Sequence, residues 1–394
     1  MTSPGLAVRP LAPFAAFAAF GAFWGMWGAS IPRLRSAAEI TDAQLGVALL
    51  FVGAGALPAM LLVGRALDRW GLRLAGPLLL ALGLAGCAVV LLAPLGFVAL
   101  CAGMALVGAT SGAADVAINS LAGRAEESTG RPVITPAHAT FSSLVVLASL
   151  LTGAAAAVRA PSALPFALVG VATLVAGAVV VRALPASSAR PDGPPAPASA
   201  SDRGLLPVAV VVGLGLLGAL AFAGENAQQS WSAAFLEDEL VVVPGVSALG
   251  PAVFAAVVAV TRFSISRVPA RHARAVVVAG ALVATGGAGL LAAAPTLPVA
   301  LAALALAAAG TAVLFPTLLG VVSRAVPEER RGRTTSLLTT LAYTGFLAGP
   351  PFVGLLADGV GMRGAMIGVA LLTALLAASA PVVLRRASVP SAGR

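Results

Sequence analysis

The chain has 394 residues, of which 59% are apolar and only 10% are charged. A soluble domain carries about 25% charged residues, so 15 acidic and 24 basic side chains cannot cover a soluble protein of this length. The composition therefore excludes a soluble fold and predicts a polytopic membrane protein, in which the net charge of +9 reports topology rather than nucleic-acid binding.

Long stretches without a charged residue predict the membrane helices. Two of them, 74–114 and 275–323, have twice the length of one span, which is about 20 residues. Each contains a proline-rich break, at 93–96 and 295–298, and therefore predicts two helices. The remaining stretches each predict one helix: 10–32, 43–64, 132–158, 160–181, 204–224, 240–261, 334–357 and 364–384. The expected fold is an all-α polytopic membrane protein with twelve transmembrane helices.

The arginines indicate the orientation of these helices. An even number of spans puts both termini on one side of the membrane, and 20 of the 24 arginines fall on that side. Cytoplasmic loops carry an excess of Lys and Arg. We therefore expect both termini in the cytoplasm of a multi-pass protein of the cell membrane (inner or plasma membrane).

One polar segment divides the predicted helices into two sets. Residues 183–204 are rich in Pro, Ala and Ser and cannot bury enough apolar surface to fold. They predict a flexible cytoplasmic linker between an N-terminal six-helix half, 1–182, and a C-terminal six-helix half, 205–394. Transporters built from two such repeats place their site between the halves, near the membrane midplane.

The loop after the second helix carries a short charged motif. Residues 64–73 read GRALDRWGLR, which resembles motif A of the major facilitator superfamily, G-x-x-x-D-R-x-G-x-R. Glycine at 64 permits close helix packing and glycine at 71 a tight turn, while Asp68 suits a helix N-terminus. In that superfamily the loop latches to helix 11 and stabilises the outward-facing state. The resemblance implies this gating role for the motif residues Gly64, Arg65, Asp68, Arg69, Gly71 and Arg73. The alternative is an ordinary solvated loop.

The resemblance extends over nearly the whole chain. It implies the major facilitator fold of two six-helix bundles, in a bacterial inner-membrane branch near the fucose-permease-like sugar transporters. The second copy of motif A keeps Arg262 but lacks the Asp and the first Gly. Ser230 stands where that branch usually has an acid, so a second carboxylate is missing there. The similar segments are 27–33, 115–119, 130–138, 225–231 and 343–351.

Ionisable residues inside membrane helices are costly and mark pathways or proton relays. Asp115 and Asn119 lie four residues apart and share one face of the fourth helix, which the resemblance implies is cavity-lining, like helices 1, 7 and 10. His138 begins the fifth helix at matching depth. An Asp115–His138 pair would bind and release protons, because His titrates near neutral pH. The alternative is a static structural pair.

Polar residues also follow the charge-free part of the seventh helix, where Glu225 is expected toward the outside. Glu225, Asn226, Gln229 and Trp231 would suit a hydroxyl-rich solute, because amides and carboxylates bond hydroxyls and an aromatic face stacks on a sugar. The alternative is a helix end at the interface, with Trp231 in the aromatic belt.

Aromatic residues of two further helices are candidate site residues. Trp24 and Trp27 lie three residues apart and share a face of the first helix, which favours cavity lining. Tyr343, the only tyrosine, lies within the eleventh helix, where a helix contact is the alternative to a ligand contact. Neither Asp115 nor Glu225 has a lysine partner, because the chain contains none, so both are candidate proton carriers together with His138.

These features predict secondary-active transport of a small polar solute, sugar-like or a related metabolite, coupled to protons and working by alternating access. A multidrug-type or metabolite exporter and a non-transporting membrane sensor are the alternatives. The two cysteines and two histidines predict no metal site or disulfide framework, and no P-loop or catalytic motif indicates an enzyme. We expect a monomer that needs no cofactor, with solute, protons and membrane lipids as its partners and no nucleic acid.

Overall fold

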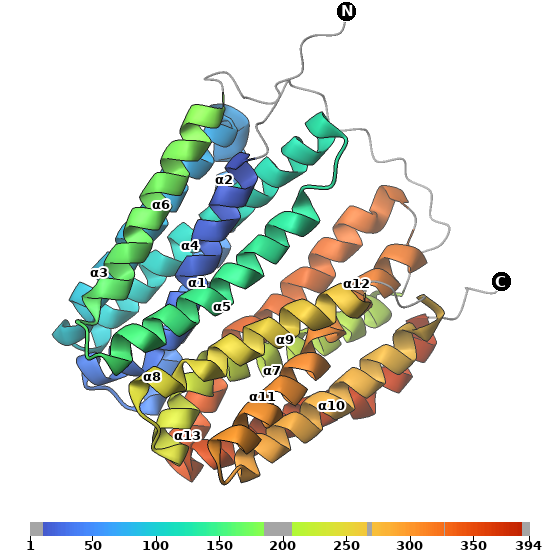
Figure 1. Ribbon diagram of the computed structural model, residues 1–394. Coiled ribbons are helices and arrows are strands. Elements are labelled where there is room, and N and C mark those ends of the chain that lie inside the picture. Colours follow the sequence, from blue (N-terminus) through green and yellow to red (C-terminus); the bar gives the residue numbers. More distant parts are fainter. Residues whose placement is uncertain (1–10, 185–206, 266–269, 327, 388–394) are drawn as a thin grey trace, which may run out of the picture. The chain divides into compact units, whose positions relative to one another are not determined.

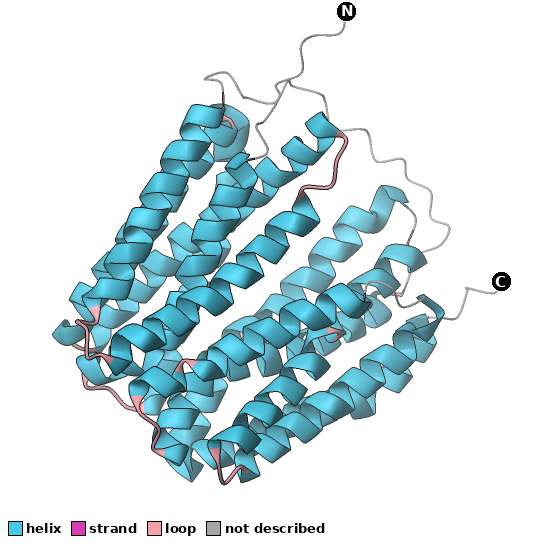
Figure 2. Ribbon diagram, in the orientation of Figure 1, coloured by secondary structure: helices cyan, strands magenta, loops and turns pink. Residues whose placement is uncertain are grey.

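The computed structural model describes residues 11–184, 207–265, 270–326 and 328–387. These residues are almost entirely helical, and no strand occurs among them (Figure 2). The predicted linker lies outside the described residues from position 185 onward. The chain forms two compact units, residues 1–192 with 241–252, and residues 193–240 with 253–394.

The first unit contains six long helices, labelled in Figure 1. The predicted break at 93–96 is confirmed: a short 3-10 turn, Ala93–Leu95, precedes Gly96, which has a φ of 94°. The short helix α8 (Pro244–Ser247) packs against α5 and belongs to this unit. The long helices are α1 (Leu11–Ala38), α2 (Asp42–Trp70), α3 (Ala75–Leu92), α4 (Phe97–Thr129), α5 (Ile134–Ala157) and α6 (Ala163–Ala183).

The second unit contains the remaining spans. The predicted break at 295–298 is confirmed, because α10 ends at Ala293 and α11 begins at Leu297. Helix α13 covers two predicted spans, divided at Gly361, whose backbone is not helical (φ 77°, ψ 166°). Helices α11 and α12 together form one candidate span, Leu297–Val322, so the twelve predicted spans are accounted for. The helices are α7 (Val208–Leu240), α9 (Leu249–Ile265, in this unit from residue 253 onward), α10 (Ala273–Ala293), α11 (Leu297–Ala312), α12 (Leu314–Ala325) and α13 (Glu328–Ala387).

Glycines let helix backbones touch in both units. A Cβ at Gly108 of α4 would overlap the carbonyl oxygen of Val52 in α2. In the second unit, a Cβ at Gly345 of α13 would overlap the carbonyl oxygen of Ala219 in α7. Small residues suit such interfaces because lipid supplies no hydrophobic force between helices, so close van der Waals packing must hold them together.

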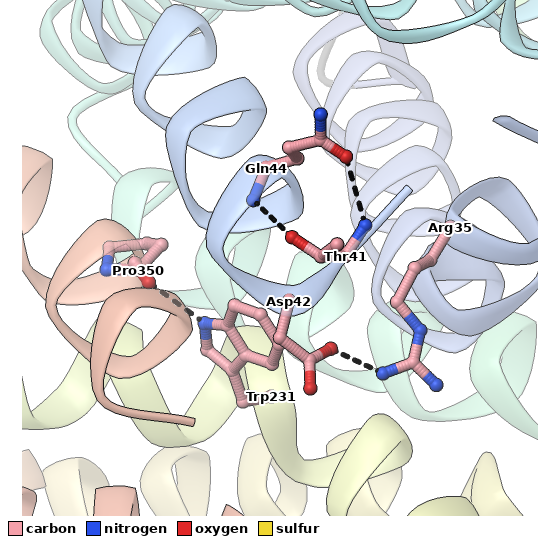
Figure 3. Close-up of polar contacts among 6 residues, drawn as sticks. All are labelled: Arg35, Thr41, Asp42, Gln44, Trp231 and Pro350. Carbon is pink, nitrogen blue, oxygen red and sulfur yellow. Dashed lines mark hydrogen bonds and ion pairs between the residues drawn. The ribbon is translucent and has the colours of Figure 1, made fainter. Parts of the chain in front are cut away.

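A capping box fixes the start of α2 (Figure 3). The Thr41 hydroxyl accepts a hydrogen bond from the Gln44 backbone N–H at 3.3 Å, and the Gln44 side chain accepts one from the Thr41 N–H at 3.0 Å. Asp42, the first residue of α2, is ion-paired with Arg35 at the end of α1. The capping box and the Arg35–Asp42 ion pair thus both stabilise the turn between α1 and α2.

Thr41→Ala is expected to lower the free energy of unfolding by about 1 kcal/mol, because the first turn of α2 loses one partner for its free N–H groups. Thermal unfolding of the purified protein in detergent measures this change. Thr41→Ser keeps the hydroxyl and serves as the matched control. If the Ala variant unfolds at the same temperature as the Ser variant, the capping box does not stabilise the protein.

Candidate functional site

Asp115, Asn119 and His138 meet in the first unit. The Asn119 side-chain Nδ2 donates to the Asp115 carboxylate at 3.1 Å and also to the Asp115 backbone carbonyl at 2.9 Å. Its Oδ1 lies 3.2 Å from Nε2 of His138. The His138 ring also packs edge-on against Phe17, with 4.8 Å between ring centroids.

Asn119 therefore stands between the two titratable groups, where a direct Asp115–His138 pair was expected. An amide oxygen accepts but cannot donate, so Nε2 of His138 must carry the proton in this arrangement. The Asn119 amide therefore orients both the Asp115 carboxylate and the His138 ring, but it cannot itself pass a proton from one to the other. Asp115 is partly buried, whereas His138 is exposed.

The motif loop after α2 has the turn that its glycine predicts. Gly71 has a φ of 75°, and its N–H donates to the Leu67 carbonyl at 2.8 Å. Arg65, Asp68 and Arg69 are exposed. At Gly64 the expected close packing is absent within the unit, because a Cβ there would meet nothing within 4 Å.

The two tryptophans of α1 form part of an aromatic row. Trp27 is buried and stacks on Phe23, with 6.1 Å between ring centroids. Trp24 is partly exposed and packs edge-on against Phe20 and Trp27. Of the pair, Trp24 is the one whose surface is open to a ligand within this unit.

Glu225 lies near the middle of α7, which continues to Leu240. The prediction that Glu225 lies toward the outside, at the end of this span, was therefore wrong. Glu225 was also expected to be unpaired. Instead its Oε1 accepts from Nη2 of Arg262 in α9 at 2.7 Å, with 14% of the Glu225 side chain exposed. The helix tolerates this carboxylate because an arginine from a neighbouring helix neutralises it.

Two prolines explain why polar side chains gather here. A proline has no N–H and so frees the carbonyl four residues earlier in its helix. Pro316 frees the carbonyl of Ala312, where α11 ends, and Nε of Arg262 approaches that oxygen at 3.4 Å. Pro350 frees the carbonyl of Phe346, which accepts from Nδ2 of Asn226 at 2.7 Å. Both freed carbonyls thus find a donor.

The other polar residues of α7 have different surroundings. Ser230 donates to Oδ1 of Asn226 at 3.2 Å. Trp231 is fully buried, and its Nε1 donates to the Pro350 carbonyl at 3.2 Å (Figure 3), so this indole joins α7 to α13 rather than lying in an aromatic belt. Gln229 is partly exposed, one turn beyond Glu225 on the same face. Gln228 is buried with no partner for Oε1 among the described residues.

Tyr343 belongs to an aromatic cluster between α7, α12 and α13. Its ring centroid lies 5.6 Å from that of Phe222 and 5.9 Å from that of Phe346. Phe222 in turn lies 4.3 Å from Phe315. The cluster borders the position of Asn226, since Phe346 supplies the carbonyl that Asn226 caps.

Five of the predicted site residues therefore fall into two clusters, one in each unit. Asp115, Asn119 and His138 make the first, and Glu225 and Asn226 belong to the second. Arg262 completes the second cluster, although the sequence indicated it only as a remnant of motif A. Prolines 316 and 350 were the available signal, because each predicts a free carbonyl one turn earlier. Among the described residues, no group of three or more His, Cys, Asp or Glu could hold a metal ion.

Residues 214–394 match the Major Facilitator Superfamily. A relative from Sinorhizobium fredii, named uncharacterized transporter y4wD, is 29% identical over 364 residues, which cover 90% of this chain and 92% of the relative. A bacterial homolog of the human lysosomal transporter Spinster has a similar structure, with a TM-score of 0.74 and 16% identity over 98% of both chains. The Escherichia coli fucose:proton symporter FucP aligns with a TM-score of 0.56 and 18% identity, covering 95% of this chain and 99% of that one.

Proposed function

Since this chain is a transporter of the major facilitator superfamily and not an enzyme, we propose that it carries a small polar solute, sugar-like or a related metabolite, by proton-coupled secondary-active transport. The transport would proceed by alternating access. The fucose:proton symporter named among the similar structures gives a precedent for such a solute on this fold.

One observation carries this proposal: each unit holds a carboxylate within a membrane helix, bonded to a second polar group. Asp115 accepts from Asn119, and Glu225 accepts from Arg262. Ionisable groups at such depth are expensive and are typical of ion pathways or substrate sites. Trp24, Asn119, Gln229 and Tyr343 are proposed to contact the solute, and Asp115, Glu225 and His138 to carry the proton.

A thermal-shift screen of the purified protein tests the class of solute. A ligand that binds the folded state raises its stability in proportion to RT ln(1 + [L]/Kd). Polar metabolites with hydroxyl groups are expected to raise the unfolding temperature, and hydrophobic drugs are not. If hydrophobic drugs alone stabilise the protein, it is a multidrug-type exporter and this proposal is wrong.

The arginine distribution leads us to propose that both termini lie in the cytoplasm. Reporter fusions placed after Arg69, within 185–204 and after Arg333 are expected to report a cytoplasmic location. A fusion after Glu237, at the far end of α7, is expected to report the opposite side. A cytoplasmic signal at Glu237 contradicts this topology.

We propose that the loop at 64–73 stabilises the outward-facing state through Asp68, as the resemblance to motif A implies. Asp68→Asn removes one exposed charge and is expected to weaken that state by about 0.3–2 kcal/mol without unfolding the protein. Labelling of single cysteines from either side of the membrane measures the balance of states. An unchanged labelling ratio in the variant shows that Asp68 has no latch role.

A further inference from the structure

The guanidinium of Arg262 uses only part of its hydrogen-bonding capacity. Arginine has five N–H donors in a planar fork. In the second unit, Nε approaches the Ala312 carbonyl at 3.4 Å and Nη2 donates to Glu225 at 2.7 Å. Nη1 has no recorded partner among the described residues, and 43% of the side chain is exposed. The outer edge of the fork, Nη1 and Nη2, can therefore receive another acceptor.

We propose that Arg262 binds a carboxylate of the transported solute, which takes the place of Glu225 on the guanidinium. This inference rests on the proposed function and narrows the solute to a hydroxylated organic acid. A carboxylate fits the two N–H groups of the fork side by side, which a neutral sugar hydroxyl cannot do. Gln229, partly exposed one turn along the same face of α7, supplies an amide for the hydroxyl groups.

Charge balance couples this exchange to a proton. Glu225 and Arg262 together have no net charge, and an entering carboxylate would leave one uncompensated negative charge in a membrane helix, which is costly. The cost disappears when Glu225 takes a proton from the aqueous phase as its bond to Arg262 breaks. The solute then forms the ion pair, Glu225 becomes a neutral acid, and the net charge of the site stays zero. One proton accompanies each carboxylate.

Among the described residues, no other ionisable side chain is in contact with Glu225 or Arg262. Of the helices packed against α7, α11 has no ionisable residue, and α12 has Arg324 near its end. On α13, Tyr343 lies in the aromatic cluster, and Arg363 is ion-paired with Glu239 at 2.8 Å. The other ionisable residues of α13 are Asp358, Arg385 and Arg386, apart from residues 328–333, whose side chains the structure does not describe. Arg262 is the one cation recorded in contact with Glu225 among the described residues.

The test compares gluconate, a hydroxylated carboxylate, with glucose, its neutral counterpart, by thermal shift of the purified full-length protein. Gluconate is expected to stabilise the wild type more strongly in acidic than in alkaline buffer. Glu225→Gln imitates the protonated acid, so it is expected to bind gluconate roughly tenfold or more tightly, with no dependence on pH. Arg262→Gln is expected to lose the gluconate shift. Arg363→Gln removes a second Arg–Glu pair of this unit, Arg363 with Glu239, and is expected to keep the shift, even where the variant itself is less stable.

Each outcome decides the inference. A gluconate shift that survives in Arg262→Gln, or that Arg363→Gln removes equally, overturns it, as does the absence of any gluconate shift in both the wild type and Glu225→Gln. A glucose shift that Arg262→Gln leaves unchanged also overturns the carboxylate site, but it leaves the proposed transport of a polar solute standing. That broader proposal fails separately, when only hydrophobic compounds stabilise the protein.

Discussion

Gly108→Ala is expected to lower the free energy of unfolding by about 1–3 kcal/mol, a large effect for one methyl group. The new Cβ would overlap the carbonyl oxygen of Val52 and lie 2.9 Å from the Val52 Cα, both of them backbone atoms. Because neither can move without its helix, α2 and α4 must separate along their contact. Thermal unfolding in detergent and the yield of monodisperse protein measure the loss.

Gly123→Ala in the same helix is the matched control. A Cβ at Gly123 meets nothing within 4 Å, and alanine favours helix over glycine by about 0.8–1 kcal/mol. This variant is therefore expected to be as stable as the wild type or more stable. Equal stability changes at positions 108 and 123 would show that backbone contact between α2 and α4 does not hold the first unit together.

Asp115→Asn is expected to weaken uphill accumulation of the solute while leaving downhill exchange in place. The amide keeps the shape of the carboxylate but cannot take up a proton, and it weakens the charge-assisted bond from Asn119. We expect proton-driven uptake to fall roughly tenfold or more, since a hydrogen bond to a charged group contributes about 1.5–3 kcal/mol. Uptake into proteoliposomes under an imposed pH gradient measures the change.

Asn119→Ala separates a functional from a structural role for this cluster. It removes the amide that orients Asp115 and His138 but keeps both titratable groups. We expect weaker solute binding with proton-driven uptake reduced rather than lost. If Asp115→Asn accumulates solute as well as the wild type does, Asp115 is a structural group.

Much of the fold could be predicted from the sequence, because a stretch of about 20 residues without a charge is recognisable as a membrane helix. The two helix hairpins were found through Pro94 with Gly96 and through Pro295 with Pro298, since such close pairs of Pro and Gly in the middle of a long apolar stretch favour a turn. The end of α7 was missed because Glu225 was taken to mark the edge of the membrane. Its partner lies 37 residues away on another helix, and periodicity carries no information about such a pair.

The candidate site was predicted in its residue types but not in its connections. Asp115 and Asn119 were expected on one face and do bond to each other, because spacing within one helix fixes that contact. Two other contacts depend on how neighbouring helices are placed: that of Asn119 with His138, and the hydrogen bond from Asn226 to the Phe346 carbonyl. The prolines at 316 and 350 predict where free carbonyls occur, but not which side chain reaches them.

Proton movement driven by solute is the most direct measurement of the proposed function. Purified protein is reconstituted into proteoliposomes without any imposed gradient, and the solute identified by thermal shift is added outside while the external pH is recorded. Proton-coupled transport predicts that the medium becomes alkaline as solute enters, and that this signal is lost when Asp115→Asn and Glu225→Gln together remove both proposed proton-carrying carboxylates. Entry of the solute into wild-type vesicles with no change in external pH contradicts proton coupling.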